Sequence, residues 1–280
     1  MITCRPMNTA DIPAGILLCR ANRWNQLPGD LEIFLQLSPD DCRVAVSEGN
    51  IVGSVTTIRY QQAFSWIGML LVDPSYQRQG IGMQLLQEAL HILRNEASIK
   101  LDATPAGREV YLKMDFKDEF RLSRMQSTVR PSMLKTTKAR PVQEEDIQKI
   151  SAFDQNIFGA SRKLLLEWTH TGSPHLAFLV AEGTEVTGYC LGRKGYTFTQ
   201  IGPVIANDFA IAEDLVSAAL ANCTGQPVIL DIPHHHPQWQ SWLTSIGFSE
   251  QRPFIRMYRG NNTSHGIPEK QFAILGPELG

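Results

Sequence analysis

The stretch VDPSYQRQGIGMQLL, residues 72–86, joins an apolar segment to a helical one and places two glycines at the junction. Gly80 and Gly82 remove side chains where a ligand would have to approach the backbone closely. The unpaired N–H groups and the dipole of the helix that begins here favour an anion, and Arg78 adds positive charge. The pattern predicts a phosphate cradle; a glycine turn that only reverses the chain is the alternative.

Two common phosphate-binding loops do not fit this stretch. The P-loop needs Lys and then Ser or Thr after its last glycine, whereas Met83 and Gln84 follow here. The dinucleotide fingerprint needs a third glycine, and Leu85 stands at that position. Asp102 lies about twenty residues further on, as a ribose-binding acid would, but without the third glycine we treat this spacing as coincidence.

The amino-acid composition limits the classes of protein to which this chain can belong. The chain has 280 residues, is 43% hydrophobic and carries a net charge of −2, which predicts one large or two smaller globular domains. The near-neutral charge argues against nucleic acid or an anionic membrane as a partner. No apolar run approaches a membrane span, and residues 1–12 lack the apolar core of a signal peptide. The five cysteines are scattered, which predicts free thiols in a reducing cytoplasm.

Segments of the first half recur in order in the second half, which indicates a tandem duplication. We therefore predict two domains, residues 1–128 and 139–280, joined by the Ser/Thr-rich basic stretch QSTVRPSMLKTTK, for which we expect no helix or strand. Each copy alternates β-rich and helical segments, which predicts an α/β or α+β layered fold. The pairs at a constant offset of 135 residues are Arg5 with Arg140, Pro6 with Pro141, Asp11 with Asp146, Ile12 with Ile147, and Gly53 with Gly188.

The glycine stretch and a later segment together resemble one known family. The pattern V-x-P-x-[YF]-[QR]-x-x-G-[IV]-[GA] of the GNAT N-acetyltransferase superfamily is matched from Val72 to Gly82. A second family block follows one strand later, where TPAGREVYLKMDF supplies Tyr111 and Phe116 at the expected spacing. Asp115 replaces the usual Gly of this block. The resemblance implies two tandem GNAT folds, each with a mixed, mostly antiparallel sheet flanked by helices.

The same resemblance implies a co-substrate and roles for particular residues. Acetyl-CoA would be the acyl donor, no metal would be required, and Tyr111 would protonate the departing thiolate. Thr104, which stands where Asn is common in the family, would contribute to the cofactor site. The other residues implied in cofactor binding are Leu70, Leu71 and Val72 on the strand, and Gln77, Arg78, Gln79, Gly80, Ile81, Gly82 and Met83 in the loop.

The second half resembles a degenerate copy of the first. Ile67 and Leu90 are 23 residues apart, but their counterparts Ile201 and Leu220 are only 19 apart, so four residues of the loop are missing. The position that corresponds to Tyr111 is Leu243. Segments such as FGASR and FAILGPELG resemble the C-terminal domain of one bacterial group of tandem GNAT proteins. We therefore expect the first half to be catalytic and the second to form a wall or lid of the acceptor site.

The general base and the acceptor site are less defined by the sequence. Many family members carry Glu four residues before the strand valine, where this chain has Gly68. Asp30, Glu32, Asp102 or a water remain as bases, although each carboxylate is better explained as a solvated or capping group than as a base. In this family the amine enters against the segment between the first two strands. We expect Trp24, Asn25 and Asp30 to bind it there; the alternative is a core tryptophan and a capping aspartate.

The function expected from these patterns is acetyl transfer from acetyl-CoA to a primary amine of a small molecule or peptide, by a cytoplasmic enzyme. The alternative is a non-catalytic acyl-CoA-binding sensor, which the absence of a carboxylate at Gly68 would favour. The run His234–His235–His236 invites a zinc site, but three consecutive histidines cannot all point one way in a regular element. We expect a surface loop at the head of a short helix there, and no oligomeric state is predicted.

Overall fold

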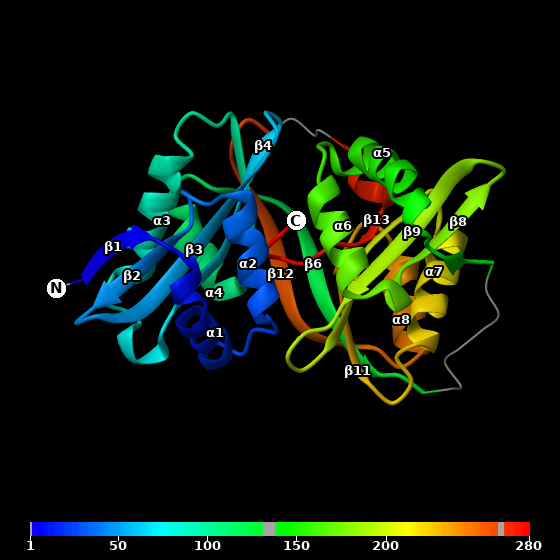
Figure 1. The fold of residues 1–280 in the computed structure, drawn as a ribbon, viewed down its shortest axis with the longest axis horizontal. Coiled ribbons are helices and arrows are strands. Elements are labelled where there is room, and N and C mark those ends of the chain that lie inside the picture. Colours follow the sequence, from blue (N-terminus) through cyan, green and yellow to red (C-terminus); the bar gives the residue numbers. More distant parts are fainter. Residues whose placement is uncertain (1, 131–137, 263–265) are drawn as a thin grey trace.

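Each half of the chain follows the same order of strands and helices (Figure 1). The computed structural model describes residues 2–130, 138–262 and 266–280. The first half consists of β1 (Ile2–Pro6), α1 (Ile12–Ala21), α2 (Pro28–Leu37), β2 (Arg43–Ser47), β3 (Asn50–Tyr60), β4 (Phe64–Val72), α3 (Ile81–Ile92), β5 (Ser98–Ala103), α4 (Pro105–Leu112) and β6 (Lys117–Thr128).

The second half repeats this order and adds one short strand. It consists of β7 (Arg140–Pro141), α5 (Ile147–Phe158), α6 (Lys163–Gly172), β8 (Phe178–Glu182), β9 (Glu185–Arg193), β10 (Thr199–Ala206), α7 (Phe209–Ala221), β11 (Pro227–Pro233), α8 (Pro237–Ser245), β12 (Ser249–Gly260) and β13 (Gln271–Ala273). Helix α7 follows β10 almost at once, with Asp208 as its N-cap, as the shortened loop predicts.

The duplicated residues make the same contacts in both halves. Arg5 donates to both oxygens of Asp11 at 2.7 and 2.8 Å, and Arg140 donates to Asp146 at the same two distances. In each copy the aspartate also accepts a backbone N–H three residues earlier, at 2.9 Å. This arrangement fixes the entry to the first helix of each half, which explains why an arginine and an aspartate recur at this spacing.

The two halves exchange their last strands within one sheet. Among the described residues the thirteen strands form a single sheet in the order β1-β2-β3-β4-β5-β12-β6-β11-β10-β9-β8-β7, with β13 beside β10. Thus β12 of the second half pairs with β5 of the first, and β6 pairs with β11, so the two long strands lie side by side between the halves (Figure 1). Pairing is parallel at β4–β5 and β10–β11 and antiparallel elsewhere.

The strand exchange corrects one expectation about the linker. Residues 126–128 were expected to lack regular structure, but they continue β6 and pair with β11, for example Ser127 with Val228. Val129 is also buried, at 1% exposure. Residues 131–137 of the same stretch lie outside the described residues. The wrong prediction has a physical reason, because a polar Ser/Thr sequence can form a strand when a neighbouring strand supplies its hydrogen bonds.

Helices cover both faces of the sheet in each half. In the first half α1 and α2 pack on one face and α3 on the other, where α3 buries Ile81, Leu85, Leu86, Ala89 and Leu90 along a single stripe. In the second half α5 and α6 cover one face and α7 and α8 the other. The layered α/β fold with a mostly antiparallel sheet is therefore confirmed.

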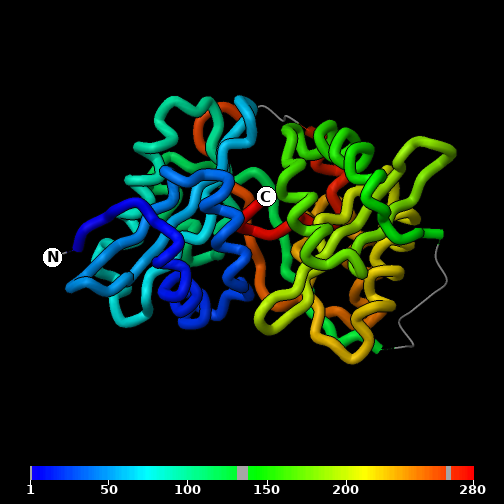
Figure 2. The backbone as a smooth tube through the Cα atoms, viewed as in Figure 1, coloured from blue at the N-terminus to red at the C-terminus, as the bar shows by residue number. Residues whose placement is uncertain are grey.

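The segment after β12 crosses from the second half into the first, and it reaches the first half beside β4 (Figure 2). All residues from 271 to 280 are buried. Within this tail, Trp66 Nε1 donates to the carbonyl of Pro277 at 3.0 Å and Tyr60 donates to that of Leu279. Arg162, from the second half, donates to the carbonyl of Gly280 at 2.9 Å. Any site that borders β4 therefore takes part of its wall from residues 271–280, which we call the tail.

Candidate active site

Strands β4 and β5 separate after a short parallel stretch. Their described pairing ends at Trp66 and Lys100. A bulge follows in β4, where the register with β3 shifts and Met69 adopts a φ of 48°, in the left-handed region. The hydroxyl of Ser54 donates to the Met69 carbonyl at 3.0 Å and fixes the bulge. The backbone of β4 beyond Trp66 is therefore free of β5 and borders a slot between the two strands.

A cavity of about 260 Å³ occupies this slot and takes its walls from both halves. The second half contributes Arg252, from β12, and Pro277 and Glu278, from the tail. The first half contributes Asn22, Trp24, residues 67–71, Asp102, Thr104 and Tyr111. The structure thus brings Leu70 and Leu71, two of the three expected strand residues, together with Thr104, Tyr111 and Trp24 at one place.

The glycine loop stands at the end of this slot, where β4 leads into α3. Gly80 is the N-cap of α3 with a φ of 83°, a conformation that favours glycine. A Cβ added at Gly80 would meet nothing within 4 Å, and one at Gly82 would meet only Val72 Cγ2 at 3.6 Å. Neither glycine is therefore needed to avoid a clash within the protein. The open space above the first N–H groups of α3 is what an anion cradle requires.

The other residues expected to bind the cofactor differ in exposure and in the contacts they make. Leu70 and Leu71 line the cavity, and the carbonyl of Val72 accepts from Asn22 Nδ2 at 3.2 Å and Gln77 Nε2 at 3.4 Å. Ile81 is buried beneath the loop in the core of the first half. The remaining loop residues are Arg78, with a φ of 62°, and Gln79, which are exposed, and Met83, which is half-buried.

Tyr111 lies on α4 with its ring held by packing. The ring lies 5.8 Å from that of Phe116, centroid to centroid, and a Cβ at Gly107 would lie 3.1 Å from it. Thr104 starts α4 and accepts from the N–H of Gly107 at 3.2 Å. Burial raises the pKa of Tyr111 to about 12, so that its phenol keeps its proton at neutral pH.

Asp115, which replaces the family glycine, occupies the turn after α4. Its φ is 63°, in the left-handed region. Asp is among the few residues other than glycine that adopt this conformation with little strain. The turn keeps its hydrogen bonds, because the N–H groups of Met114 and Phe116 both donate to the Tyr111 carbonyl, at 2.9 and 3.2 Å. The substitution is therefore accommodated without displacing Tyr111 from the cavity.

Among the described residues, the two carboxylates of Asp102 and Glu278 line the cavity, and each has an arginine partner from the second half. Asp102 accepts from Arg256 through both oxygens at 2.9 Å. Burial raises the pKa of Asp102, and the Arg256 guanidinium opposes that shift. Glu278 pairs with Arg193 through Oε1, whereas its buried Oε2 has no hydrogen-bond partner among the described residues. Glu278 thus keeps one carboxylate oxygen for another donor.

The absence of a side chain at Gly68 allows Glu278 to reach this position. A Cβ at Gly68 would lie 2.5 Å from the Glu278 carbonyl oxygen, closer than real contacts allow, so only glycine lets the tail pass β4 here. Four further residues line the cavity without having been predicted from the sequence: Asn22, Arg252, Pro277 and Glu278. A glycine in place of the expected strand glutamate was the one sequence signal that another segment approaches β4.

Trp24 lines the cavity, but Asn25 and Asp30 are not among the residues that do. The Asn25 side chain accepts from the N–H groups of Thr197 and Phe198, at 2.9 and 3.0 Å, in the loop between β9 and β10. The Asp30 carboxylate caps its own helix at Leu27 N and pairs with Arg193. Both side chains hold the segment that carries Trp24 against the second half.

In the second half, the tail fills the slot that corresponds to the cavity. Strands β10 and β11 also pair over two residues only and then separate. There β13 pairs with β10 at Val204 and Ile205, and the N–H of Ile274 donates to the Asp231 carbonyl of β11 at 2.9 Å. Leu243, at the position of Tyr111, is fully buried in the core. The second slot is therefore closed by the chain itself, in addition to lacking the glycine loop.

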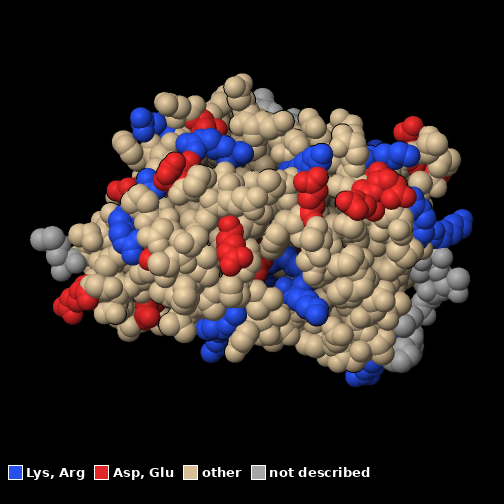
Figure 3. Space-filling view, in the orientation of Figure 1, with Lys and Arg blue, Asp and Glu red and all other residues tan. Residues whose placement is uncertain are grey.

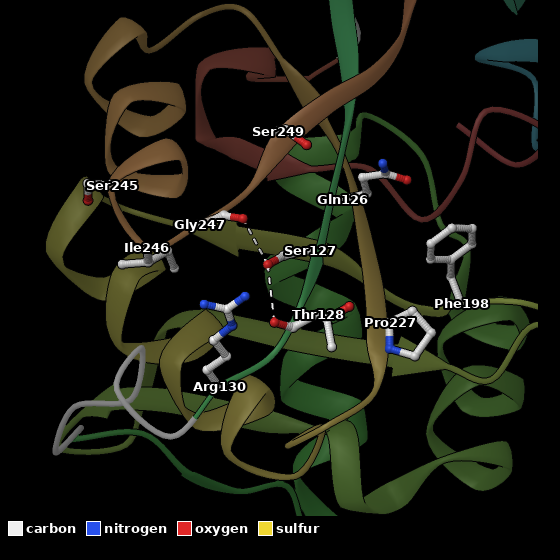
Figure 4. A pocket seen from close by; sticks show the side chains of 10 residues that line it. All are labelled: Gln126, Ser127, Thr128, Arg130, Phe198, Pro227, Ser245, Ile246, Gly247 and Ser249. Carbon is white, nitrogen blue, oxygen red and sulfur yellow. Dashed lines mark hydrogen bonds between the residues drawn. The ribbon is translucent and has the colours of Figure 1, made fainter.

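A larger cavity, of about 660 Å³, lies on the second half beside β6 and the end of α8 (Figure 4). Its described lining residues include the hydroxyls of Ser127, Thr128, Ser245 and Ser249, and Arg130. The Ser127 hydroxyl is already bonded to the Gly247 carbonyl at 2.9 Å. No carboxylate, histidine, cysteine or tyrosine is among these residues, so this cavity offers no obvious proton donor or base.

Comparison with known families agrees with this geometry. A model of the acetyltransferase (GNAT) family matches residues 14–116, and a model of an acetyltransferase (GNAT) domain matches residues 150–273. The chain belongs to the GNAT acetyltransferase family. It is a tandem GNAT protein, since each half matches a model of its own.

Relatives of this tandem GNAT protein extend over most of its length. It is 26% identical to holothin acyltransferase of a Pseudoalteromonas species, over 93% of this chain and 88% of that protein. It is 25% identical to an uncharacterized N-acetyltransferase of Bacillus subtilis, over 75% of each chain. A putative acetyltransferase from Pyrococcus horikoshii has the same fold, with a TM-score of 0.85, 24% identity and coverage of 100% and 96%. These findings support an acyltransferase of the GNAT class.

Other features of this tandem GNAT protein concern possible partners. Within the described residues, no group of three or more His, Cys, Asp or Glu side chains could hold a metal ion. In the histidine run, His234 contacts Ser123 at 2.7 Å and His236 contacts the Glu269 carbonyl. No described helix is long and apolar enough to span a membrane. Acidic and basic side chains are interspersed on the face shown in Figure 3.

Proposed function

We propose that this protein is an N-acetyltransferase that moves an acetyl group from acetyl-CoA to a primary amine of a small molecule or peptide. One observation supports this most directly: the cavity combines an unpaired edge of β4, a glycine loop at its end and a protonated phenol. The names of the relatives agree with acyl transfer. We further propose that residues 1–128 are the catalytic GNAT domain, with the acyl-donor site and the acid, and that residues 139–280 supply walls of the acceptor site and, from the tail, the base.

The residues present fit acetyl-CoA. Main-chain groups of Leu70 and Leu71 on the cavity wall, with those of Val72 at the end of the strand, would hold the pantetheine arm. The first turn of α3 with residues 77–83 would hold the pyrophosphate. The open space at Gly80 and Gly82 leaves room for that group. Acetyl-CoA supplies an acetyl group already activated as a thioester. Residues 67–71 also form an apolar wall that excludes water from one side of the cavity.

Tyr111 is the proposed acid. Its Oη would transfer a proton to the leaving sulfur as the carbon–sulfur bond breaks and the carbon–nitrogen bond forms. Because burial keeps the phenol protonated at neutral pH, the donor is ready without a preceding ionisation. Trp24 would form the wall against which the amine stands, and Asn25 and Asp30 would act through it by holding its segment to the second half.

Glu278 is the proposed base. The attacking amine must lose one proton, and the two oxygens of Asp102 are both engaged by Arg256. Glu278 is 1% exposed, lines the cavity and has an unpartnered Oε2. Oε2 would accept the proton of the amine directly or through a water. The tail would thus supply a carboxylate that β4 lacks at Gly68.

Glu278→Gln is expected to lower kcat/KM about ten- to hundredfold at neutral pH, with recovery toward the parent value at high pH, where the amine is already neutral. Gln keeps a hydrogen-bonding oxygen toward Arg193, so the tail should stay in place. The measurement is a pH profile of kcat/KM, with Glu182→Gln, at an exposed position of β8 outside the cavity lining, as control. An equal loss at every pH, or no loss, would contradict the role as base.

The experiment that tests the proposed function is thiol detection of CoA released from acetyl-CoA across a panel of amines. We expect amine-dependent release, and mass spectrometry should show the acetylated amine. The competing function is a non-catalytic acyl-CoA-binding sensor. It would be favoured by acetyl-CoA binding without release in the presence of any amine, and by an unchanged thioester after long incubation.

A further inference from the structure

Among the charged side chains that line the cavity, Arg252 differs from the others. Asp102 is bonded to Arg256, and Glu278 is paired with Arg193. Arg252 is half-buried, yet it has no hydrogen-bond or ion-pair partner among the described residues. A guanidinium removed from much of its water and left without an acceptor is unfavourable unless a ligand supplies one.

The surroundings of Arg252 do not neutralise it. The acidic group that acts on Arg252 is Asp231, whose oxygens accept from Arg124 at 2.8 Å each and from Gln200 at 3.0 Å. Arg124 and Arg23 add positive charge. Burial, followed by the influence of Arg124, lowers the pKa of Arg252, although it stays charged at neutral pH. An anion in this part of the cavity would therefore meet a net positive field.

Arg252 lies away from the proposed cofactor cradle. It precedes Ile255, the β12 residue that pairs with Ala103 at the carboxyl end of β5. Strand β5 therefore stands between β12 and β4, the strand that leads to the glycine loop. Arg252 interacts electrostatically with Arg23, which lies in the chain between Asn22 and Trp24, two cavity residues of the segment expected to face the amine. The anion that Arg252 would bind therefore belongs to the acceptor substrate and not to the cofactor.

We propose that Arg252 binds a carboxylate of the acceptor, so that the substrate is a small amine that also carries a carboxylate group. The guanidinium fork matches a carboxylate with two parallel hydrogen bonds, which are stronger when partly desolvated. A site with an unpaired buried charge also discriminates against an analogue that lacks the partner. This inference rests on the proposed function, because it names the acceptor of that reaction.

The test compares acids with their amides. Glycine, β-alanine and phenylalanine would each be compared with the corresponding amide as acceptors, and CoA release would give kcat/KM. In parallel, the CoA-loaded protein would be titrated with the N-acetyl acid and the N-acetyl amide of each pair, followed by thermal shift. The variants are Arg252→Gln and Arg252→Lys, with Arg259→Gln, at the other end of β12 and outside the cavity lining, as control.

We expect the acid to be preferred in at least one pair, and Arg252→Gln to lower kcat/KM for that acid about tenfold or more while the amide changes less than about twofold. Arg252→Lys should fall between, and acetyl-CoA affinity should not change. Acid-specific stabilisation by the N-acetyl compound should also disappear in Arg252→Gln.

The proposal is overturned if no acid preference is found in either readout, if the preference survives in Arg252→Gln, or if this variant weakens acetyl-CoA binding instead. Failure of the proposed function gives a different result. In that case no amine is acetylated, but the stabilisation by the N-acetyl acid still depends on Arg252, and the carboxylate site stands.

Discussion

Tyr111→Phe is expected to lower kcat about a hundredfold or more while the Kd for acetyl-CoA stays within about twofold of the parent value. The variant removes only the hydroxyl, and the ring contacts with Phe116 and Gly107 remain. That hydroxyl has no hydrogen-bond partner among the described residues, so its loss leaves no buried group unsatisfied. The loss should therefore fall on proton transfer to the leaving sulfur and not on folding.

Steady-state kinetics and calorimetry measure the two quantities separately. Tyr258→Phe, on β12 and outside the cavity lining, is the matched control and should behave as the parent. With a pKa of about 12, Tyr111 should not produce a loss of activity between pH 7 and pH 9. Equal turnover of Tyr111→Phe and the parent would reduce Tyr111 to a packing residue of α4.

Gly82→Trp should abolish acetyl-CoA binding, with a loss in affinity of about a hundredfold or more, because the indole would fill the space left for the pyrophosphate. The substitution should not unfold the protein. A Cβ at Gly82 makes an ordinary contact of 3.6 Å with Val72, and the residue lies in the first turn of a helix. Most residues also favour a helical conformation more than glycine does.

The control for Gly82→Trp is Gly172→Trp, at the end of α6. Gly172 is exposed, and a Cβ there would meet nothing within 4 Å. Calorimetric titration and thermal unfolding would be recorded for both variants. Normal acetyl-CoA affinity in a folded Gly82→Trp protein would mean that the glycine loop is not the cradle.

Much of the fold could be predicted from local patterns. The recurrence of an arginine and an aspartate predicted a duplication, and the structure explains it through two equal ion pairs, Arg5–Asp11 and Arg140–Asp146. The glycine junction likewise predicted the start of α3. Such features depend on residues close together in the chain, where period and spacing carry the information.

The exchange of β6 and β12 could not be predicted in this way. In sequence, both segments have the pattern of a last strand. The strand with which each one pairs depends on contacts between residues more than a hundred positions apart, such as Ser127 with Val228. The exchange also affects experiments. Deleting residues 139–280 would remove β12 and leave the edge of β5 unpaired, so the isolated first half is a poor test of a shared acceptor site.

The placement of the residues proposed for the cofactor could be predicted from the sequence, and that of the residues proposed for the acceptor only partly. Thr104, Tyr111 and the β4 residues come from one half in short order, and they line the same cavity. The side chains of Asn25 and Asp30 bond to residues of the other half. Asn25 accepts from the N–H groups of Thr197 and Phe198, and Asp30 pairs with Arg193. Nothing near Arg252 or Glu278 in the sequence marks them as neighbours of Tyr111, because the exchanged strand and the tail bring them there.

The central claim is that the first half holds the acyl-donor site and that the second slot is closed by β13. Calorimetric titration of the full chain with acetyl-CoA tests it most directly. One site per chain is expected, because β13 pairs with β10 where a second pantetheine arm would lie and because the second glycine loop is missing. The same titration of Gly82→Trp should show no binding. Two equivalent sites per chain, or one site that survives in a folded Gly82→Trp protein, would contradict this account.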